Sequence, residues 1–129
     1  MRAPIFKFTV IGIQEIMKVD VDGRPLETAE DVWTRFSDRV IETLDIVLNR
    51  LGISFYTDDE VAKNNMRYCR KKDYALCSLR DGFCGVYDAC ARILKDGRHV
   101  HVVYQEFWDD VQPLTFVVID VVIREPREV

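Results

Sequence analysis

The stretch Arg98-His-Val-His-Val-Val-Tyr-Gln-Glu-Phe107 and the later stretch Thr115-Phe-Val-Val-Ile-Asp-Val-Val-Ile-Arg124 decide the fold of this chain. β-Branched and aromatic residues fill both stretches, and the intervening residues include Asp109, Asp110 and Pro113, which are typical of turns. The pattern predicts an antiparallel hairpin. Because both faces of the second strand are apolar, we expect it inside a sheet covered on both sides, or covered on one side by another subunit.

A long helix is the clearest element upstream of the hairpin. Thr28 and Asp31 have the spacing of a capping box, and Gly52 is a typical helix stop. Between them, apolar residues recur every three or four positions, which predicts a helix with one buried face. These apolar residues are Val32, Phe36, Val40, Leu44, Val47 and Leu51.

The remaining elements follow from shorter patterns. We predict a long strand over Ile5–Val21, short strands over Ile53–Tyr56 and Tyr74–Leu79, and helices from Thr57 to about Cys69 and from Gly82 to Lys95. Together these elements predict one α+β domain spanning residues 1–129. The domain is mainly an antiparallel β-sheet, with one long helix and one or two shorter helices packed on it.

Composition limits the classes of function. The formal net charge of −4 argues against a protein that coats nucleic acid, because phosphate binding depends on Lys and Arg. No apolar run has the length of a membrane helix, and the N-terminus lacks the features of a signal peptide. We therefore expect a cytoplasmic, reducing environment.

The four cysteines are Cys69, Cys77, Cys84 and Cys90, and no pair has the C-x-x-C spacing of a zinc ribbon or finger. In a reducing cytosol we expect them to be unpaired core residues rather than disulfides or zinc ligands. The composition indicates no cofactor.

One set of residues suggests catalysis. Cys84 lies at the predicted start of a helix, where the helix dipole favours a thiolate, and His101 is a suitable proton acceptor for such a thiol. Asp120 interrupts an apolar strand and therefore needs a partner or a ligand. This order of Cys-Gly, His and Asp resembles the papain-like cysteine peptidases, especially those that process bacteriocins. The resemblance implies that Cys84 is a nucleophile, His101 a base and Asp120 the residue that orients it.

Strand register tests this triad. In an antiparallel pair, His101 and Asp120 point to the same face only if the residue numbers of paired positions have an odd sum. An even sum would turn Asp120 to the other face. The sequence of the loop permits either register.

The His99-Val-His101 motif supports a further alternative. Alternation along a strand points both imidazoles to one side, and the motif resembles the paired metal ligands of HUH endonucleases. Such enzymes also need a tyrosine nucleophile, for which Tyr87 is the candidate here.

Two surfaces are candidates for binding. Arg67, Arg70, Lys71 and Lys72 form the only positively charged run and lie at the predicted end of a helix. Trp108, Asp109 and Asp110 lie at the tip of the hairpin, where an exposed aromatic residue favours contact with a partner.

The leading hypothesis is a small non-enzymatic binding or regulatory domain that acts through protein–protein contacts and forms a homodimer. It rests on the two apolar faces of the last strand. The alternatives are a cysteine hydrolase or acyl-transfer enzyme that uses Cys84, and a metal-dependent nuclease of the HUH type.

Overall fold

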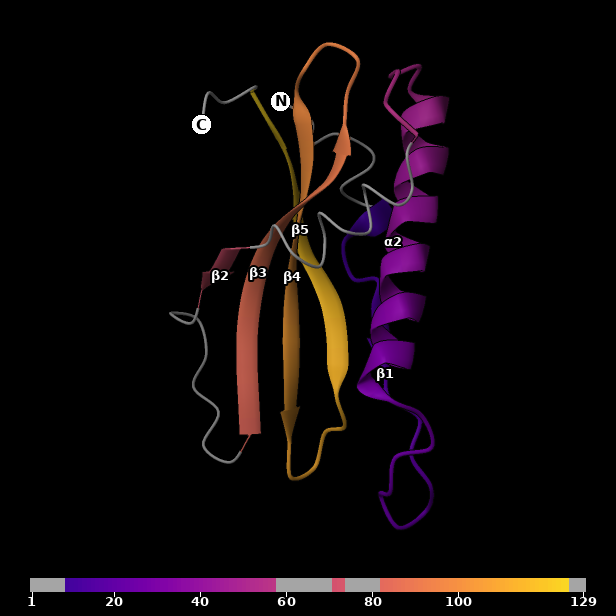
Figure 1. Ribbon diagram of the computed structural model, residues 1–129, viewed down its shortest axis with the longest axis vertical. Coiled ribbons are helices and arrows are strands. Elements are labelled where there is room, and N and C mark those ends of the chain that lie inside the picture. Colours follow the sequence, from indigo (N-terminus) through magenta and orange to yellow (C-terminus); the bar gives the residue numbers. More distant parts are fainter. Residues whose placement is uncertain (1–8, 58–70, 74–81, 126–129) are drawn as a thin grey trace.

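The computed structural model describes residues 9–57, 71–73 and 82–125. In chain order its elements are β1 (Gln14–Ile16), α2 (Ala29–Arg50), β2 (Lys71–Asp73), β3 (Gly82–Ile93), β4 (His99–Asp109) and β5 (Thr115–Arg124). The strands form one antiparallel sheet in the order β1-β5-β4-β3-β2 (Figure 1). The predicted α+β class, with an antiparallel sheet and one long helix, is confirmed.

Helix α2 begins where the sequence predicts. The Thr28 hydroxyl accepts a hydrogen bond from the Asp31 N–H, and the Asp31 carboxylate accepts one from the Thr28 N–H. This reciprocal pair satisfies donors that the first turn leaves without partners inside the helix. After Leu51, Gly52 adopts a φ of +71°, which ends the helix at little steric cost.

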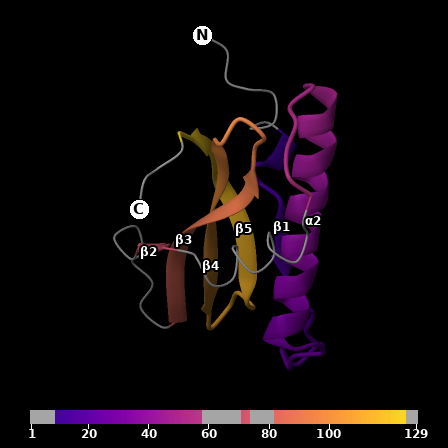
Figure 2. The same ribbon diagram turned by 45° about the horizontal axis from the view of Figure 1, so that its top comes forward.

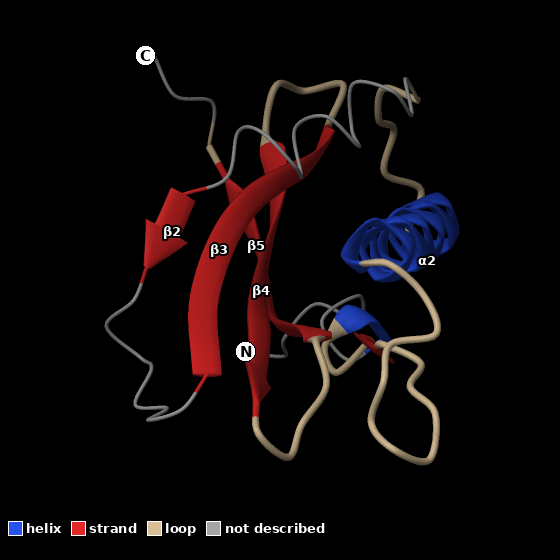
Figure 3. Ribbon diagram, turned by 60° about the horizontal axis from the view of Figure 1, so that its bottom comes forward, coloured by secondary structure: helices blue, strands red, loops and turns tan. Residues whose placement is uncertain are grey.

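The buried face of α2 packs on one face of the sheet (Figure 3). Aromatic residues fill the centre of this interface. Trp33 and Phe36 of the helix each have a ring centroid 5.4 Å from that of Phe116, and Phe36 lies 5.5 Å from Tyr104. Because these large side chains exclude water from both layers, they supply much of the hydrophobic stabilisation of the domain.

The hairpin predicted from the opening stretch of sequence is confirmed, and β5 lies between β1 and β4 as an interior strand. Two irregularities interrupt the register of the long strands. One lies in β3 between Cys90 and Arg92. The other lies in β5 at Ile119, which has no partner residue because Val103 and Tyr104 of β4 pair with Asp120 and Val118. Each bulge changes which side chains point towards α2.

The helix predicted over Gly82–Lys95 is wrong, because these residues form strand β3. The spacing of their apolar residues also fits a strand, in which every second side chain points to the same face. Tyr87, Ala89 and Ala91 are buried on the side of the sheet that faces α2. As a strand, residues 82–93 form backbone hydrogen bonds with β4 along its length. As a helix, they would leave those backbone groups of β4 without these partners. The tertiary partner therefore decides between two local patterns.

The long strand predicted over Ile5–Val21 is reduced to β1 within the described residues. Gly12 has a φ of +89°, which turns the chain before Gln14. The predicted strand over Ile53–Tyr56 is only an isolated bridge between Phe55 and Leu94.

Two further predicted elements cannot be compared with the structure. The predicted helix from Thr57 to about Cys69 and the predicted strand over Tyr74–Leu79 fall almost entirely outside the described residues. Of the helices that the structure describes, none is both long and apolar enough to cross a membrane. Strand β2 lies at the sheet edge farthest from α2 (Figure 2).

Candidate metal centre

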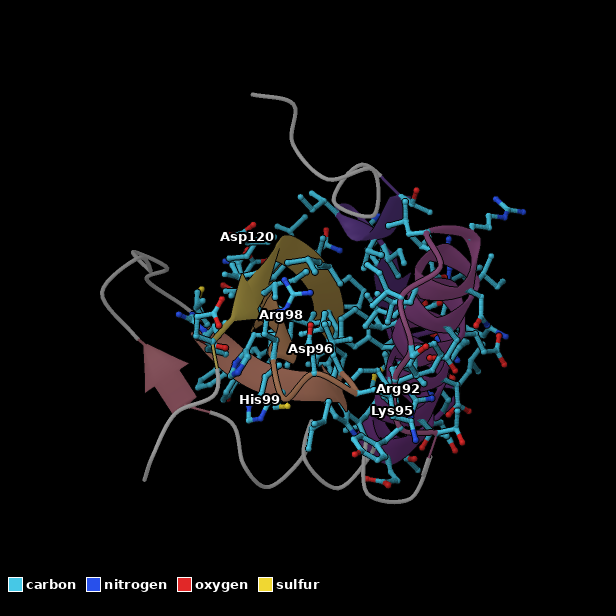
Figure 4. All side chains as sticks on the ribbon, turned by 90° about the horizontal axis from the view of Figure 1, so that it is seen from above. Arg92, Lys95, Asp96, Arg98, His99 and Asp120 are labelled. Carbon is cyan, nitrogen blue, oxygen red and sulfur yellow. The ribbon has the colours of Figure 1, made fainter. Side chains whose placement is uncertain are left out.

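The face of the sheet opposite α2, here called the outer face, carries both histidines of the chain. Along β4, Val100 and Val102 point into the core and are fully buried, so alternation directs His99 and His101 to the outer face. Their rings are nearly parallel, with centroids 6.1 Å apart. In Figure 4, His99 lies on the side of the sheet away from α2.

Cys90 joins the two histidines from the neighbouring strand. It pairs directly with His101 across β3 and β4, and it is not disulfide-bonded. One donor atom each from Cys90, His99 and His101 lies within 4.8 Å of the other two. All three residues are partly buried. We call this group the thiol–imidazole cluster.

A carboxylate lies beside the cluster. Asp88, two residues before Cys90 on β3, has its Oδ1 atom 2.7 Å from Nδ1 of His101. Its other oxygen accepts a hydrogen bond from Nη2 of Arg124 at 2.6 Å. Arg124 comes from β5, so the polar group spans the three long strands of the sheet.

Local backbone structure positions the cluster. In the turn after β3, the backbone N–H of Arg98 donates to Asp96, and the Arg98 side chain also donates to it. These bonds lower the pKa of Asp96 below its usual value, the backbone bond having the larger effect. The turn therefore sets the start of β4, and with it the place of His99.

The bulge in β3 separates the cluster from the core. The Cys90 thiol lies 3.7 Å from the Arg92 carbonyl oxygen, while the Arg92 side chain turns to the other face and binds Asp45 of α2 (Figure 4). Without the extra residue, Arg92 would share the outer face with Cys90. The bulge therefore keeps a permanent cation away from the thiol.

The donor set fits a transition metal. Thiolate and imidazole are the usual zinc ligands, with bond lengths near 2.3 and 2.0 Å, and tetrahedral geometry then separates the ligand atoms by about 3.3 to 3.8 Å. The observed spacing of up to 4.8 Å closes to this range if the donors move by about 1 Å. Rotation of three partly buried side chains provides such a movement.

The structure does not bring the predicted triad of Cys84, His101 and Asp120 together. Cys84 pairs with Phe107, six residues along β4 from His101, which corresponds to roughly 20 Å. Cys84 lies on a strand rather than at the start of a helix, and it is disulfide-bonded, contrary to the expectation of free thiols. Its sulfur accepts a hydrogen bond from Gln105 at 3.0 Å. In this state Cys84 has no thiol to deprotonate.

Asp120 does share a face with His101. His101 pairs with Val122 and Val103 pairs with Asp120, so this part of the hairpin has the odd register sum that the triad required. However, Asp88 and not Asp120 holds the imidazole. The Asp120 carboxylate accepts a hydrogen bond from the Val121 N–H at 2.8 Å.

Tyr87 does not serve the HUH interpretation. It points to the helix side of the sheet, is 4% exposed and stacks on Tyr104 with ring centroids 5.3 Å apart. The histidines lie on the opposite face, so the sheet separates Tyr87 from any metal bound there. The prediction that both imidazoles point to one side is confirmed.

The predicted binding residues are only partly described. Trp108 is 47% exposed at the end of β4, and Asp110 is exposed. Asp109 has a structural role, since its carboxylate accepts the backbone N–H groups of Val111 and Gln112. Arg67 and Arg70 lie outside the described residues, whereas Lys71 and Lys72 are described only as the backbone of β2.

Two members of this site, Cys90 and Asp88, were not predicted from the sequence. Both were assigned to a predicted helix, on which they would not align with the His99-Val-His101 motif. Treated as a strand, residues 88 and 90 alternate onto one face, as 99 and 101 do. The short turn at Asp96 then places the two pairs side by side.

Comparison of this chain with protein-family models, curated proteins and solved structures finds no match. The site must therefore be interpreted from its own geometry.

Proposed function

We propose that this chain is a small non-enzymatic binding domain whose ligand is a transition-metal ion, held by Cys90, His99 and His101. The observation that supports this proposal is the convergence of three donor atoms within 4.8 Å on one face of two adjacent strands. Asp88 adds the carboxylate that commonly accompanies a metal-binding histidine.

The chemistry of the donors favours zinc. One thiolate and two imidazoles suit zinc and other borderline or soft ions, whereas magnesium, manganese and calcium prefer oxygen ligands. The HUH interpretation needs an ion that polarises a phosphate. Hard ions such as magnesium and manganese commonly have this role, and the sulfur of Cys90 is a poor ligand for them. Zn²⁺ is therefore the probe of choice, and Co²⁺ its spectroscopic substitute.

Metal binding also has a structural consequence. An ion held by Cys90 of β3 and by His99 and His101 of β4 links two strands beside their turn. Because such a site exists only in the folded chain, binding stabilises the fold. At a free zinc concentration about 100-fold above Kd, the gain is about 2.7 kcal/mol. For a domain of this size, Tm then rises by roughly 10 °C.

The first prediction is that the full-length protein, with the disulfide of Cys84 intact, binds one equivalent of Zn²⁺, measured by competition with a chromophoric chelator. The Co²⁺ form should show ligand-field bands of a tetrahedral ion and a sulfur-to-metal band of one thiolate. Substitutions C90S, H99A and H101A should each weaken zinc binding by more than the ~10- to 100-fold that loss of an outer-shell partner causes. The sulfur-to-metal band should disappear in C90S alone.

Asp120→Asn is the matched control, because Asp120 lies on the same face without belonging to the cluster. It should bind zinc as the wild type does. Absence of zinc binding by the wild type, or equal binding by C90S, would refute the proposed function.

A second candidate function is self-association through the hairpin tip. It is supported by two exposed apolar side chains close together in sequence, Trp108 at 47% and Val111 at 91%. Large exposed apolar groups are typical of contact surfaces. A homodimer formed in this way would accord with the protein-binding role expected from the sequence.

The second prediction concerns this surface. In sedimentation velocity over a range of concentrations, we expect the wild type to form a dimer. W108S combined with V111S should shift the equilibrium to monomer without changing zinc affinity. A wild type that stays monomeric at high concentration, or a variant that dimerises equally well, would exclude the hairpin tip as the contact.

A further inference from the structure

We propose that Asp88 is a positioning residue that sets the tautomer and orientation of His101 for the metal, and that Arg124 holds Asp88 in this role. The inference rests on the proposed function, since it concerns the same ion. It adds a carboxylate and a guanidinium that do not bind the metal themselves.

The geometry assigns each oxygen of Asp88 to a different partner. Oδ1 lies 2.7 Å from Nδ1 of His101, and Oδ2 lies 2.6 Å from Nη2 of Arg124. The three residues come from β3, β4 and β5, and their side chains are between 20% and 41% exposed. A carboxylate held at both oxygens has little freedom to rotate.

The contact with His101 determines which ring nitrogen is available. A neutral imidazole that donates its Nδ1–H to Asp88 keeps the lone pair on Nε2, which is then free for the metal. A carboxylate at Nδ1 also increases the ligand strength of the imidazole. His101 is therefore oriented before the metal arrives, which reduces the entropy lost on binding.

Arg124 explains why Asp88 stays outside the coordination sphere. One oxygen is bound to the guanidinium and the other to the imidazole, so turning the carboxylate towards the ion would break one of these two bonds. The donor cluster consistently contains Cys90, His99 and His101 but not Asp88. Arg124 also balances the charge of Asp88 and so preserves its fixed orientation.

His99 provides the contrast within the same site. In the part of the chain that the structure describes, no carboxylate holds His99 as Asp88 holds His101. We therefore expect His101 to be the preorganised ligand and His99 to be the one that adjusts when the metal binds.

The third prediction tests this role with D88A, D88N and R124Q, using D120N as the control on the same face. Long-range ¹H–¹⁵N correlation spectra of the metal-free protein at pH 8 should show His101 with its proton on Nδ1. D88A should give a mixture of tautomers, and D88N should retain more of the Nδ1–H form because its amide oxygen can still accept. A merely structural role for Asp88 would leave the tautomer unchanged.

Zinc affinity, measured with the same chelator, should fall by about 10- to 100-fold in D88A and by less in D88N and R124Q. The D120N control should match the wild type. Circular dichroism identifies any variant that does not fold, and in that case D88N and R124Q carry the test.

The outcomes separate the two proposals. If the wild type binds zinc but the Asp88 variants keep both its affinity and the His101 tautomer, the role of Asp88 is refuted and the metal site stands. If the wild type binds no zinc, the proposed function is refuted, and this inference falls with it even where the tautomer responds to Asp88.

Discussion

Arg92 is the residue whose placement the sequence least suggests, because its side chain is charged and only 1% exposed. Its Nε and Nη2 atoms donate to the two oxygens of Asp45 at 2.8 and 2.7 Å. The guanidinium also lies 5.4 Å from the ring centroid of Phe55. This bidentate pair joins the sheet to α2 directly behind the thiol–imidazole cluster.

The fourth prediction follows from the unequal burial of this pair. D45A removes the carboxylate that accepts two hydrogen bonds from the buried guanidinium, which should cost about 3–5 kcal/mol of unfolding free energy. R92M leaves a carboxylate that is 29% exposed and can be hydrated, so its cost should be lower, roughly 1–2 kcal/mol. Urea denaturation of both variants measures the difference.

The exposed ion pair of Arg39 with Glu15 provides the control, since R39A should cost no more than about 1 kcal/mol. Equal losses for D45A and R92M would show that burial does not govern this interaction.

At the residue scale, the structure places His101 beside other residues than the two predicted from the sequence. The expected thiol was Cys84 and the expected acid Asp120, whereas the structure places Cys90 and Asp88 beside the ring. The types of residue around His101 were predictable, because imidazole, thiol and carboxylate are common partners. Which cysteine and which aspartate lie beside the ring depended on strand register, which a single sequence specifies only weakly.

At the element scale, α2 shows how local signals can suffice. Its capping box, its apolar period and the glycine after it all lie within or next to the helix itself, so no distant residue was needed to predict it. The hairpin of β4 and β5 was equally predictable from β-branched residues on either side of a turn.

Strand β3 shows the opposite case. Its apolar residues fit both the helical period and the two-residue alternation of a strand. Its alanines are compatible with a helix and its first residue is a glycine, and neither feature decides between the two patterns. Hydrogen bonding to β4, a partner further along the chain, decides the outcome. The candidate site was therefore hidden by one wrong element rather than by an unusual motif.

At the scale of the whole molecule, Arg35 connects three separate parts of the chain. From α2 it donates to Glu15 of β1 and, with two nitrogens, to both oxygens of Glu27. Glu27 also accepts the backbone N–H of Lys18. These bonds fix the segment that leads from β1 to the helix.

The fifth prediction uses this network. Hydrogen bonds from Arg35, and then from Lys18, lower the pKa of Glu27 from 4.5 to about 2. Because the folded-state pKa lies below the unfolded value, the stabilisation is complete above pH 4.5 and is lost as pH falls towards 2. E27Q should remove this component and flatten the fall in stability over that interval.

The measurement is the urea midpoint of wild type and E27Q at a series of pH values from 6 down to 2. The two curves should be separated at pH 6 and converge in acid. Curves that stay parallel throughout the interval would show that Glu27 does not contribute to the acid sensitivity of the fold.

The amino-acid sequence by itself determined the α+β class, the long helix and the final hairpin, because each depends on residues close together in the chain. Only the tertiary structure decided that residues 82–93 form a strand, and only it brought Cys90 and Asp88 to His101. The physical reason is that strand pairing and register depend on hydrogen bonds between distant segments, and a shift of one residue moves every side chain to the other face of the sheet.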